Sequence, residues 1–126
     1  MEETINICES VKDEYLYHLN AKDNNVVLEF QNLKLIFNSF LIFKNGYPNE
    51  EAFSTQKLFR NNDLKLSTLY QISNSLWIEE IKKNNQVHPR HKDEIFDRFR
   101  HFIIFFSDES FECISKSYEI KKLRDS

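Results

Sequence analysis

The chain has 126 residues and a formal net charge of -3, a balance that argues against nucleic acid as its main partner. Aromatic residues make up 14% and charged residues 29%, so the composition is that of a folded domain and excludes a disordered chain. With one glycine, Gly46, and two prolines, the sequence excludes the glycine-rich loops of phosphate-binding and dinucleotide-binding enzymes.

The N-terminal segment, residues 1–10, is acidic and lacks the apolar stretch of a secretory signal. No part of the sequence approaches the ~20 consecutive apolar residues that a membrane helix needs. We therefore expect a cytoplasmic protein without membrane contact, in which Cys8 and Cys113 are free thiols. The two ends, residues 1–10 and 121–126, are the parts of the chain most prone to fray.

The first third of the chain has the pattern of strands. Residues 15–19 are rich in aromatic side chains, and an Asn-Asn pair at residues 24–25 marks a turn. Residues 26–30 then alternate with the period of two that is typical of a half-buried strand. Residues 33–43 form a longer apolar segment in which an Asn-Ser pair marks a bend, and an Asn-Gly turn followed by a proline predicts a loop over residues 45–49.

The middle of the chain predicts helices that alternate with strands. Residues 50–60 form a short helix capped by Asn49, and residues 64–72 form a further strand. Residues 76–83 have their apolar side chains on one helical face. Residues 93–100 carry the clearest helical pattern, because acidic residues begin it, arginines end it, and apolar residues recur at helical spacing.

The most informative segment comprises residues 101–114. The continuous apolar run 102–106 predicts a central strand that is buried on both faces. A polar turn over residues 107–110 then connects it to a second strand over residues 111–114, so the segment predicts a β-hairpin. Residues 117–120 have the composition of a last strand.

Together these elements predict a single α+β domain spanning residues 1–126. We expect a mainly antiparallel β-sheet with two or three short helices packed on one of its faces. No repeat, low-complexity tract or Pro/Gly/Ser-rich linker divides the sequence into further units.

Three histidines form a candidate metal site. His88 and His91 lie three residues apart in a predicted loop, and His101 begins the predicted central strand. Groups that could complete a zinc site with them are Asp108, Glu112 and Cys113. Because the spacings of common zinc motifs are missing, we expect these histidines to be polar surface residues and expect no cofactor.

Cys113 is a second chemical candidate, as a nucleophile with His101 as its base. A reactive thiol needs a lowered pKa, which a nearby cation or a helix N-terminus can provide. Its neighbour Glu112 carries the opposite charge, and strand alternation places Cys113 on the same face as Phe111. The sequence therefore favours a buried, inert thiol.

Acidic and aromatic residues supply the candidate contacts with a partner. Asp108, Glu109 and Glu112 could act as a general acid and base, but Asp is also a common turn former, so we expect a solvated acidic turn. Such a turn can contact a basic partner. Tyr47 and Trp77 are candidate aromatic anchors, although core packing is the commoner role of a Trp at helical spacing.

The sequence contains no serine-hydrolase, kinase, P-loop or zinc-protease motif, which argues against an enzyme. We expect a small, non-enzymatic bacterial binding protein, an immunity-type inhibitor that neutralises a toxin by occlusion. A basic toxin domain would suit it as a partner, because opposite charges steer association. The alternatives are a small enzyme or metal-binding domain built on the three histidines with nearby acids or Cys113, and a structural or adaptor subunit.

Overall fold

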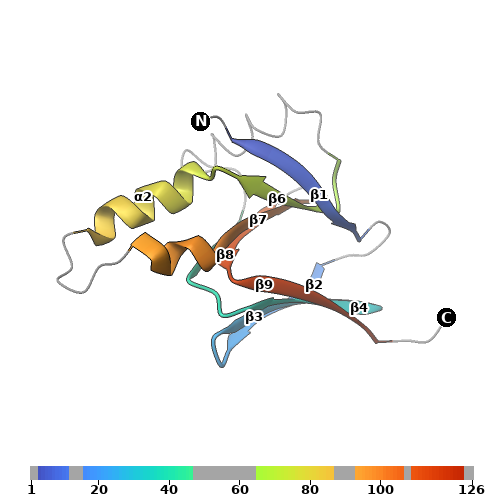
Figure 1. Ribbon diagram of the computed structural model, residues 1–126. Helices are drawn as coiled ribbons and strands as arrows, with labels where there is room; N and C mark the ends of the chain where they lie inside the picture. The colour runs from blue at the N-terminus through green and yellow to red at the C-terminus, as the bar shows by residue number, and fades with distance from the viewer. Residues whose placement is uncertain (1–2, 12–15, 47–64, 87–92, 107–108, 124–126) are drawn as a thin grey trace.

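Two antiparallel sheets pack face to face in the computed structural model, and the helical segments lie on the outer face of the larger sheet (Figure 1). The structure describes residues 3–11, 16–46, 65–86, 93–106 and 109–123. Within these ranges it has nine strands, one α-helix and one 3-10 helix. No helix in the described part of the chain is long and apolar enough to cross a membrane.

The larger sheet has five strands in the order β1-β6-β7-β8-β5. Their bounds are Thr4–Ser10 for β1, Ile42–Gly46 for β5, Thr68–Ser73 for β6, Arg100–Phe105 for β7 and Ser110–Ser115 for β8. The prediction that the apolar run after His101 forms a central strand, paired with the strand that follows it, is confirmed. β1 lies in the segment expected to fray, yet it pairs with β6, with a bulge between Ile7 and Glu9.

The smaller sheet has four strands in the order β2-β3-β4-β9. Their bounds are Leu16–Lys22 for β2, Asn25–Phe30 for β3, Leu33–Asn38 for β4 and Ser117–Lys122 for β9. Asp23 and Asn24 connect β2 to β3 with φ values of 54° and 67°, the left-handed conformation that a tight two-residue hairpin turn requires. Asp and Asn tolerate this conformation better than most residues. The turn predicted at residues 24–25 therefore forms, but at residues 23–24.

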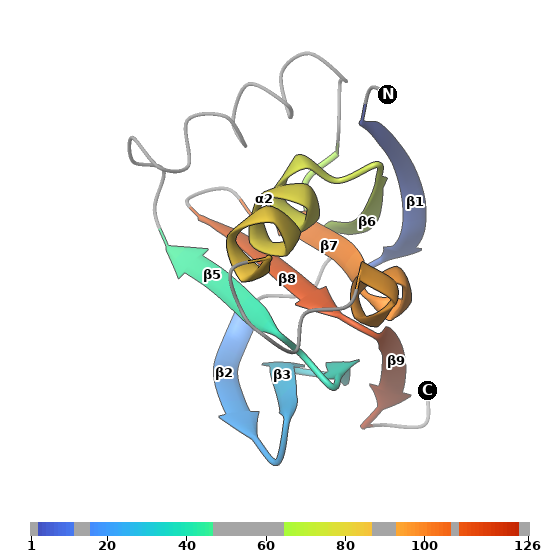
Figure 2. The same cartoon turned by 60° about the vertical axis from the view of Figure 1, so that its left-hand side comes forward.

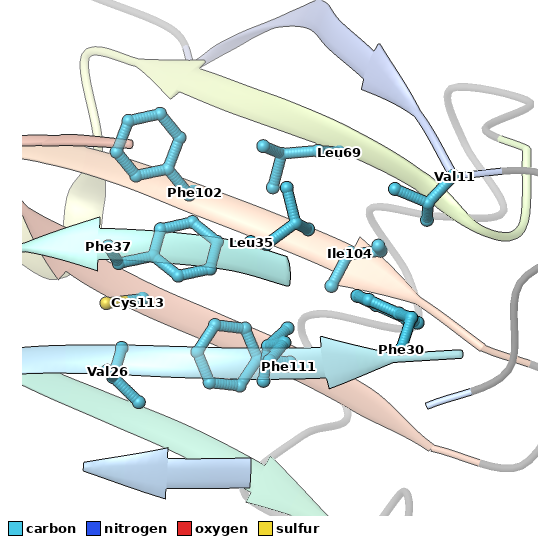
Figure 3. Close-up of a cluster of buried hydrophobic side chains, with 11 residues drawn as sticks. Val11, Val26, Phe30, Leu35, Phe37, Leu69, Phe102, Ile104, Phe111 and Cys113 are labelled. Atoms are coloured by element: carbon cyan, nitrogen blue, oxygen red, sulfur yellow. The ribbon is translucent and has the colours of Figure 1, made fainter. Parts of the chain in front are cut away.

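The core lies between the two sheets, and β3 shows how the sequence builds it. Val26, Leu28 and Phe30 are buried, whereas the residues between them are half-buried on the opposite face. Figure 3 shows side chains of both sheets meeting in this layer. The ring of Phe37 on β4 lies 5.6 Å from Phe102 of the larger sheet. Aromatic packing across the layer therefore holds the sheets together.

The outer face of the larger sheet carries a second apolar cluster, formed by Tyr70, Ile72, Ile103 and Phe105. β7 is thus buried on both faces, as its continuous apolar sequence predicts. The helix α2 (Leu76–Asn85) and the 3-10 helix η1 (Asp93–Arg98) lie over this face (Figure 2). The shape of the domain is therefore a helical layer, a five-stranded sheet and a four-stranded sheet, in that order.

The expected fold class, one sheet with two or three helices on one face, is wrong. Strands make up 60% of the described residues and helical segments 17%, and a second sheet covers the inner face of the first. The predicted strand over residues 33–43 is in fact two strands in different sheets, β4 and β5, and Ser39 between them has a φ of 53°. The helix expected over residues 93–100 is a 3-10 helix of 6 residues. The helix expected over residues 50–60 lies outside the described residues.

Candidate functional site

A series of buried polar side chains lies on the outer face of the larger sheet, beneath the N-terminus of α2. Ser75 Oγ is 2.7 Å from His101 Nδ1, and His101 Nε2 is 2.9 Å from Glu112 Oε1. Ser75, His101 and Glu112 are 5%, 3% and 7% exposed. We call these three residues the polar relay.

Two members of the relay are positioned by the register of β7 and β8. Ile103 on β7 pairs with Glu112 on β8, and His101 pairs with Ile114. His101 and Glu112 are therefore diagonal neighbours on one face of the sheet, a spacing that long side chains can bridge. Alternation along both strands turns these two side chains away from the core between the sheets.

Ser75 is positioned by a sharp connection between β6 and α2. β6 ends at Ser73, Asn74 has a φ of 58°, and Ser75 is the N-cap of the helix. Its Oγ accepts a hydrogen bond of 3.1 Å from the backbone N–H of Ile78. Serine is favoured at this position because its oxygen satisfies an otherwise unpaired helical N–H. The same oxygen reaches His101.

One protonation arrangement satisfies the donors and acceptors of these bonds. With Glu112 ionised and His101 in its neutral Nε2–H tautomer, Nε2 donates to the carboxylate and Nδ1 is left as an acceptor. The Ser75 hydroxyl then donates to Nδ1 while its oxygen accepts from Ile78. A hydroxyl that donates to such an imidazole is polarised, as in serine nucleophiles, and the same bonds also satisfy buried polar atoms structurally.

Three further residues cover the relay. The ring of Trp77 stands edge-on to the imidazole of His101, with ring centroids 5.2 Å apart, and Lys44 Nζ lies 4.2 Å from the Trp77 ring centroid. Lys44 on β5 is also the register partner of Glu112. Glu3 Oε2, from the segment before β1, accepts a hydrogen bond of 2.9 Å from the N–H of Leu76. The N-terminus of α2 is thus held by a carboxylate as well as by its serine cap.

The structure brings some of the predicted partner contacts together and separates others. Glu112 and Trp77 both adjoin His101, but Glu112 is buried in the relay and does not present the surface charge expected of it. Glu109 is half-buried at the β7–β8 connection, where its carbonyl accepts a bond of 2.7 Å from the Phe106 N–H. Asp108 and Tyr47 lie outside the described residues, as do both loop histidines.

The structure leaves the metal-site hypothesis open and contradicts the thiol–imidazole hypothesis. Within the described ranges, no group of three or more His, Cys, Asp or Glu residues could hold a metal ion. Because His88 and His91 lie outside those ranges, a site that includes them stays a hypothesis. Cys113 is buried in the inter-sheet core, and burial raises its pKa to about 12. It lies on the opposite face of the sheet from His101, so the proposed thiol–imidazole pair does not form.

Sequence reasoning missed Ser75 as a candidate residue. The sequence does contain a signal, because a Ser-Asn-Ser group precedes the apolar helical face that starts at Leu76, and serine is a preferred N-cap. Nothing in the spacing, however, indicates its partner, since 26 residues separate it from His101. Only the pairing of β6 with β7 brings the two side chains together.

Comparison of the chain with protein families, curated proteins and solved structures finds no match. Two features of the described residues bear on function: the buried polar relay, and the exposed surface of the helical layer above it.

Proposed function

We propose that this chain is an immunity-type inhibitor, a protein that neutralises a toxin domain by covering its working surface. The observation that carries the proposal is the exposed surface of α2 and η1. Leu76 of α2 is 64% exposed and Ile95 of η1 is 50% exposed. Exposed carboxylates on the same two helical segments belong to Glu79, Glu80, Glu94 and Asp97. Apolar side chains within a polar rim are typical of protein interfaces.

The charges of this layer support a basic partner. Glu79 is 3.6 Å from Lys82 and is partly neutralised by it, whereas Glu94 and Asp97 both belong to the short η1 segment. Carboxylates on one face raise the rate at which a positively charged partner associates, and they disfavour acidic competitors. The acidic β7–β8 connection, with Asp108 and Glu109, remains part of the proposed contact surface.

An open hollow of about 520 Å³ lies along α2 on this surface. It is lined by Leu76, Glu79, Glu80, Lys82, Lys83 and Gln86. The two carboxylates lie toward the N-terminal half of the helix and the lysines toward its C-terminal half, so a basic side chain fits best beside Glu79 and Glu80.

The experiment that tests the proposal begins with affinity purification of the chain from its host cells, and mass spectrometry of the proteins that copurify. The activity of each stoichiometric partner is then measured with and without the chain. We expect a toxin-like enzyme with a basic surface that loses its activity at an equimolar ratio. A chain that inhibits none of its copurifying proteins would contradict the proposal.

Charge reversal locates the surface once the partner is known. We expect Glu94→Lys combined with Asp97→Lys to slow association about 10-fold at low ionic strength, with a smaller effect at high salt. The control is Glu119→Lys, an exposed carboxylate on β9 of the other sheet; it reverses one charge, and each single variant, Glu94→Lys or Asp97→Lys, should slow association more than it does. Equal on-rates for the helical-layer variant and the control would place the interface elsewhere.

A further inference from the structure

The polar relay has a chemical capacity that binding does not use. We propose that Ser75 is a nucleophile for acyl transfer, with His101 as its base and Glu112 as the residue that orients the imidazole. A hydroxyl, an imidazole and a carboxylate follow one another at 2.7 Å and 2.9 Å, within the range that proton transfer requires. This activity lies beyond the proposed inhibition of a toxin and is separable from it.

The local backbone also suits a nucleophilic serine. Ser75 lies at a strand-to-helix connection, between the end of β6 and the first turn of α2, and Asn74 before it has a φ of 58°. Such a connection places the hydroxyl beside the first N–H groups of a helix, which can stabilise an oxyanion once their present side-chain acceptors are displaced. Serine hydrolases also place their nucleophile at a strand-to-helix turn, but there the serine itself is strained and exposed, whereas Ser75 has a φ of −60° and is buried.

The two ring nitrogens of His101 have exchanged the partners that they have in the usual Ser-His-Asp triad. Here Nδ1 faces the serine and Nε2 faces the carboxylate. Either ring nitrogen can act as a base when the other carries the proton, so the reversal keeps the chemistry intact. The burial of Glu112, at 7% exposed, strengthens its hydrogen bond to Nε2 and holds the tautomer that the reaction needs.

Glu3 identifies where the oxyanion would lie. Its Oε2 accepts a hydrogen bond of 2.9 Å from the N–H of Leu76, the first residue of α2 after Ser75. A negatively charged oxygen therefore already occupies the donor that a tetrahedral intermediate on Ser75 would use. Glu3 acts as an internal competitor for that position.

The covered site selects for small substrates. Trp77 lies edge-on against His101, and Ser75 is only 5% exposed, so a substrate must displace Glu3 and pass the indole ring. The indole of Trp77 beside His101 favours an apolar acyl group. The substrate class is therefore a small ester with a short acyl chain.

The reaction balances without a cofactor. Ser75 Oγ attacks the ester carbonyl carbon as its proton moves to His101 Nδ1, and a C–O bond to Oγ forms. Collapse of the tetrahedral intermediate breaks the bond to the alcohol, which leaves with the proton from Nδ1. Water then attacks the acyl-serine with the same base, releases a carboxylic acid and restores the hydroxyl. Glu112 stays ionised throughout.

The test is labelling of the full chain with a small alkyl fluorophosphonate, followed by intact mass and peptide mapping. We expect one adduct, on Ser75, none in Ser75→Ala, and an unchanged rate in Ser73→Ala, the matched serine two residues earlier. His101→Gln and Glu112→Gln should lower the labelling rate about 100-fold or more while circular dichroism shows a folded chain. A folded wild-type chain that gives no adduct on Ser75 would overturn the proposal.

A variant of Glu3 distinguishes a nucleophilic Ser75 from a Ser75 that is only a structural helix cap. We expect Glu3→Gln to raise the labelling rate several-fold, because the competing charge is removed from the Leu76 N–H. Glu9→Gln, an exposed carboxylate on β1, is the matched control and should have no effect. A labelling rate that stays constant or falls in Glu3→Gln would contradict the assigned oxyanion position.

Discussion

His101 Nδ1 lies 2.7 Å from Ser75 Oγ, and this contact joins the central strand of the larger sheet to the N-terminal cap of α2. The same imidazole contacts Glu112 on the neighbouring strand at 2.9 Å. None of the residues of α2, all of which the structure describes, is fully buried. At the first turn of this helix, polar bonds and the indole of Trp77 meet the sheet.

Removal of the serine hydroxyl should measure the strength of that attachment. Ser75→Ala takes the cap from the Ile78 N–H and leaves His101 Nδ1 without its hydroxyl partner. We expect the free energy of unfolding to fall by about 1–3 kcal/mol in urea titrations. Ser73→Ala, which removes only a weak 3.4 Å contact with Asn6, should change it by less than about 0.5 kcal/mol. Equal effects of the two substitutions would show that the relay adds no stability.

Hydrogen exchange should show that α2 opens before the sheets unfold. Because α2 buries no side chain completely, its opening exposes little apolar surface and costs a fraction of the global free energy. We expect amides of residues 80–85 to exchange much faster than those of β7, whose residues 101–105 are buried. Ser75→Ala should raise the amide exchange rates of α2 much more than those of β7. Matching protection of the two elements would contradict this independence.

Part of the fold could be predicted because the local pattern allows few alternatives. The run of apolar residues after His101 has no polar face, so it had to be buried on both sides, and β7 is central. The architecture could not be predicted in the same way. A half-buried strand such as β3 needs a cover for its apolar face, and alternation does not say whether a helix or a second sheet supplies it.

The helix expected near Ile95 shows how a local pattern can mislead. Phe96 of η1 is buried, whereas its neighbour Ile95 is exposed, so the apolar spacing did not mark one buried face. β7 begins at Arg100, and its pairing with β6 and β8 shortens the helical segment. The candidate site was beyond local reasoning altogether, because Ser75 and Glu112 meet His101 only through the strand order.

The inter-sheet aromatic cluster should be the main source of stability. Phe37 is fully buried, with its ring 5.6 Å from Phe102 and 5.3 Å from Phe111. We expect Phe37→Ala to lower the free energy of unfolding by about 3–5 kcal/mol, because it removes buried area and leaves a cavity. Leu123→Ala, at an exposed position after β9, should cost less than about 0.5 kcal/mol. A small loss for Phe37→Ala would mean that the sheets repack without it.

Cys113 should make the stability of the protein depend on alkaline pH. Burial raises the pKa of its thiol from 9.0 to about 12, so the folded chain keeps this proton over a range in which the unfolded chain loses it. Above the unfolded pKa, ionisation stabilises only the unfolded state. The contribution is therefore fully present below pH 9.0 and is lost as pH rises toward about 12, by at most about 1.4 kcal/mol per pH unit.

Unfolding of two variants at two pH values isolates this effect. Burial, followed by the charge of Glu9, also raises the pKa of the Cys8 thiol, so both variants carry Cys8→Ala. The free energy of unfolding is compared between Cys8→Ala and Cys8→Ala/Cys113→Ala at about pH 8 and about pH 10.5. Other alkaline titrations act on both chains equally and cancel. We expect the difference to move by about 1–2 kcal/mol in favour of the double variant at the higher pH, whereas a constant difference would mean that Cys113 ionises alike in both states.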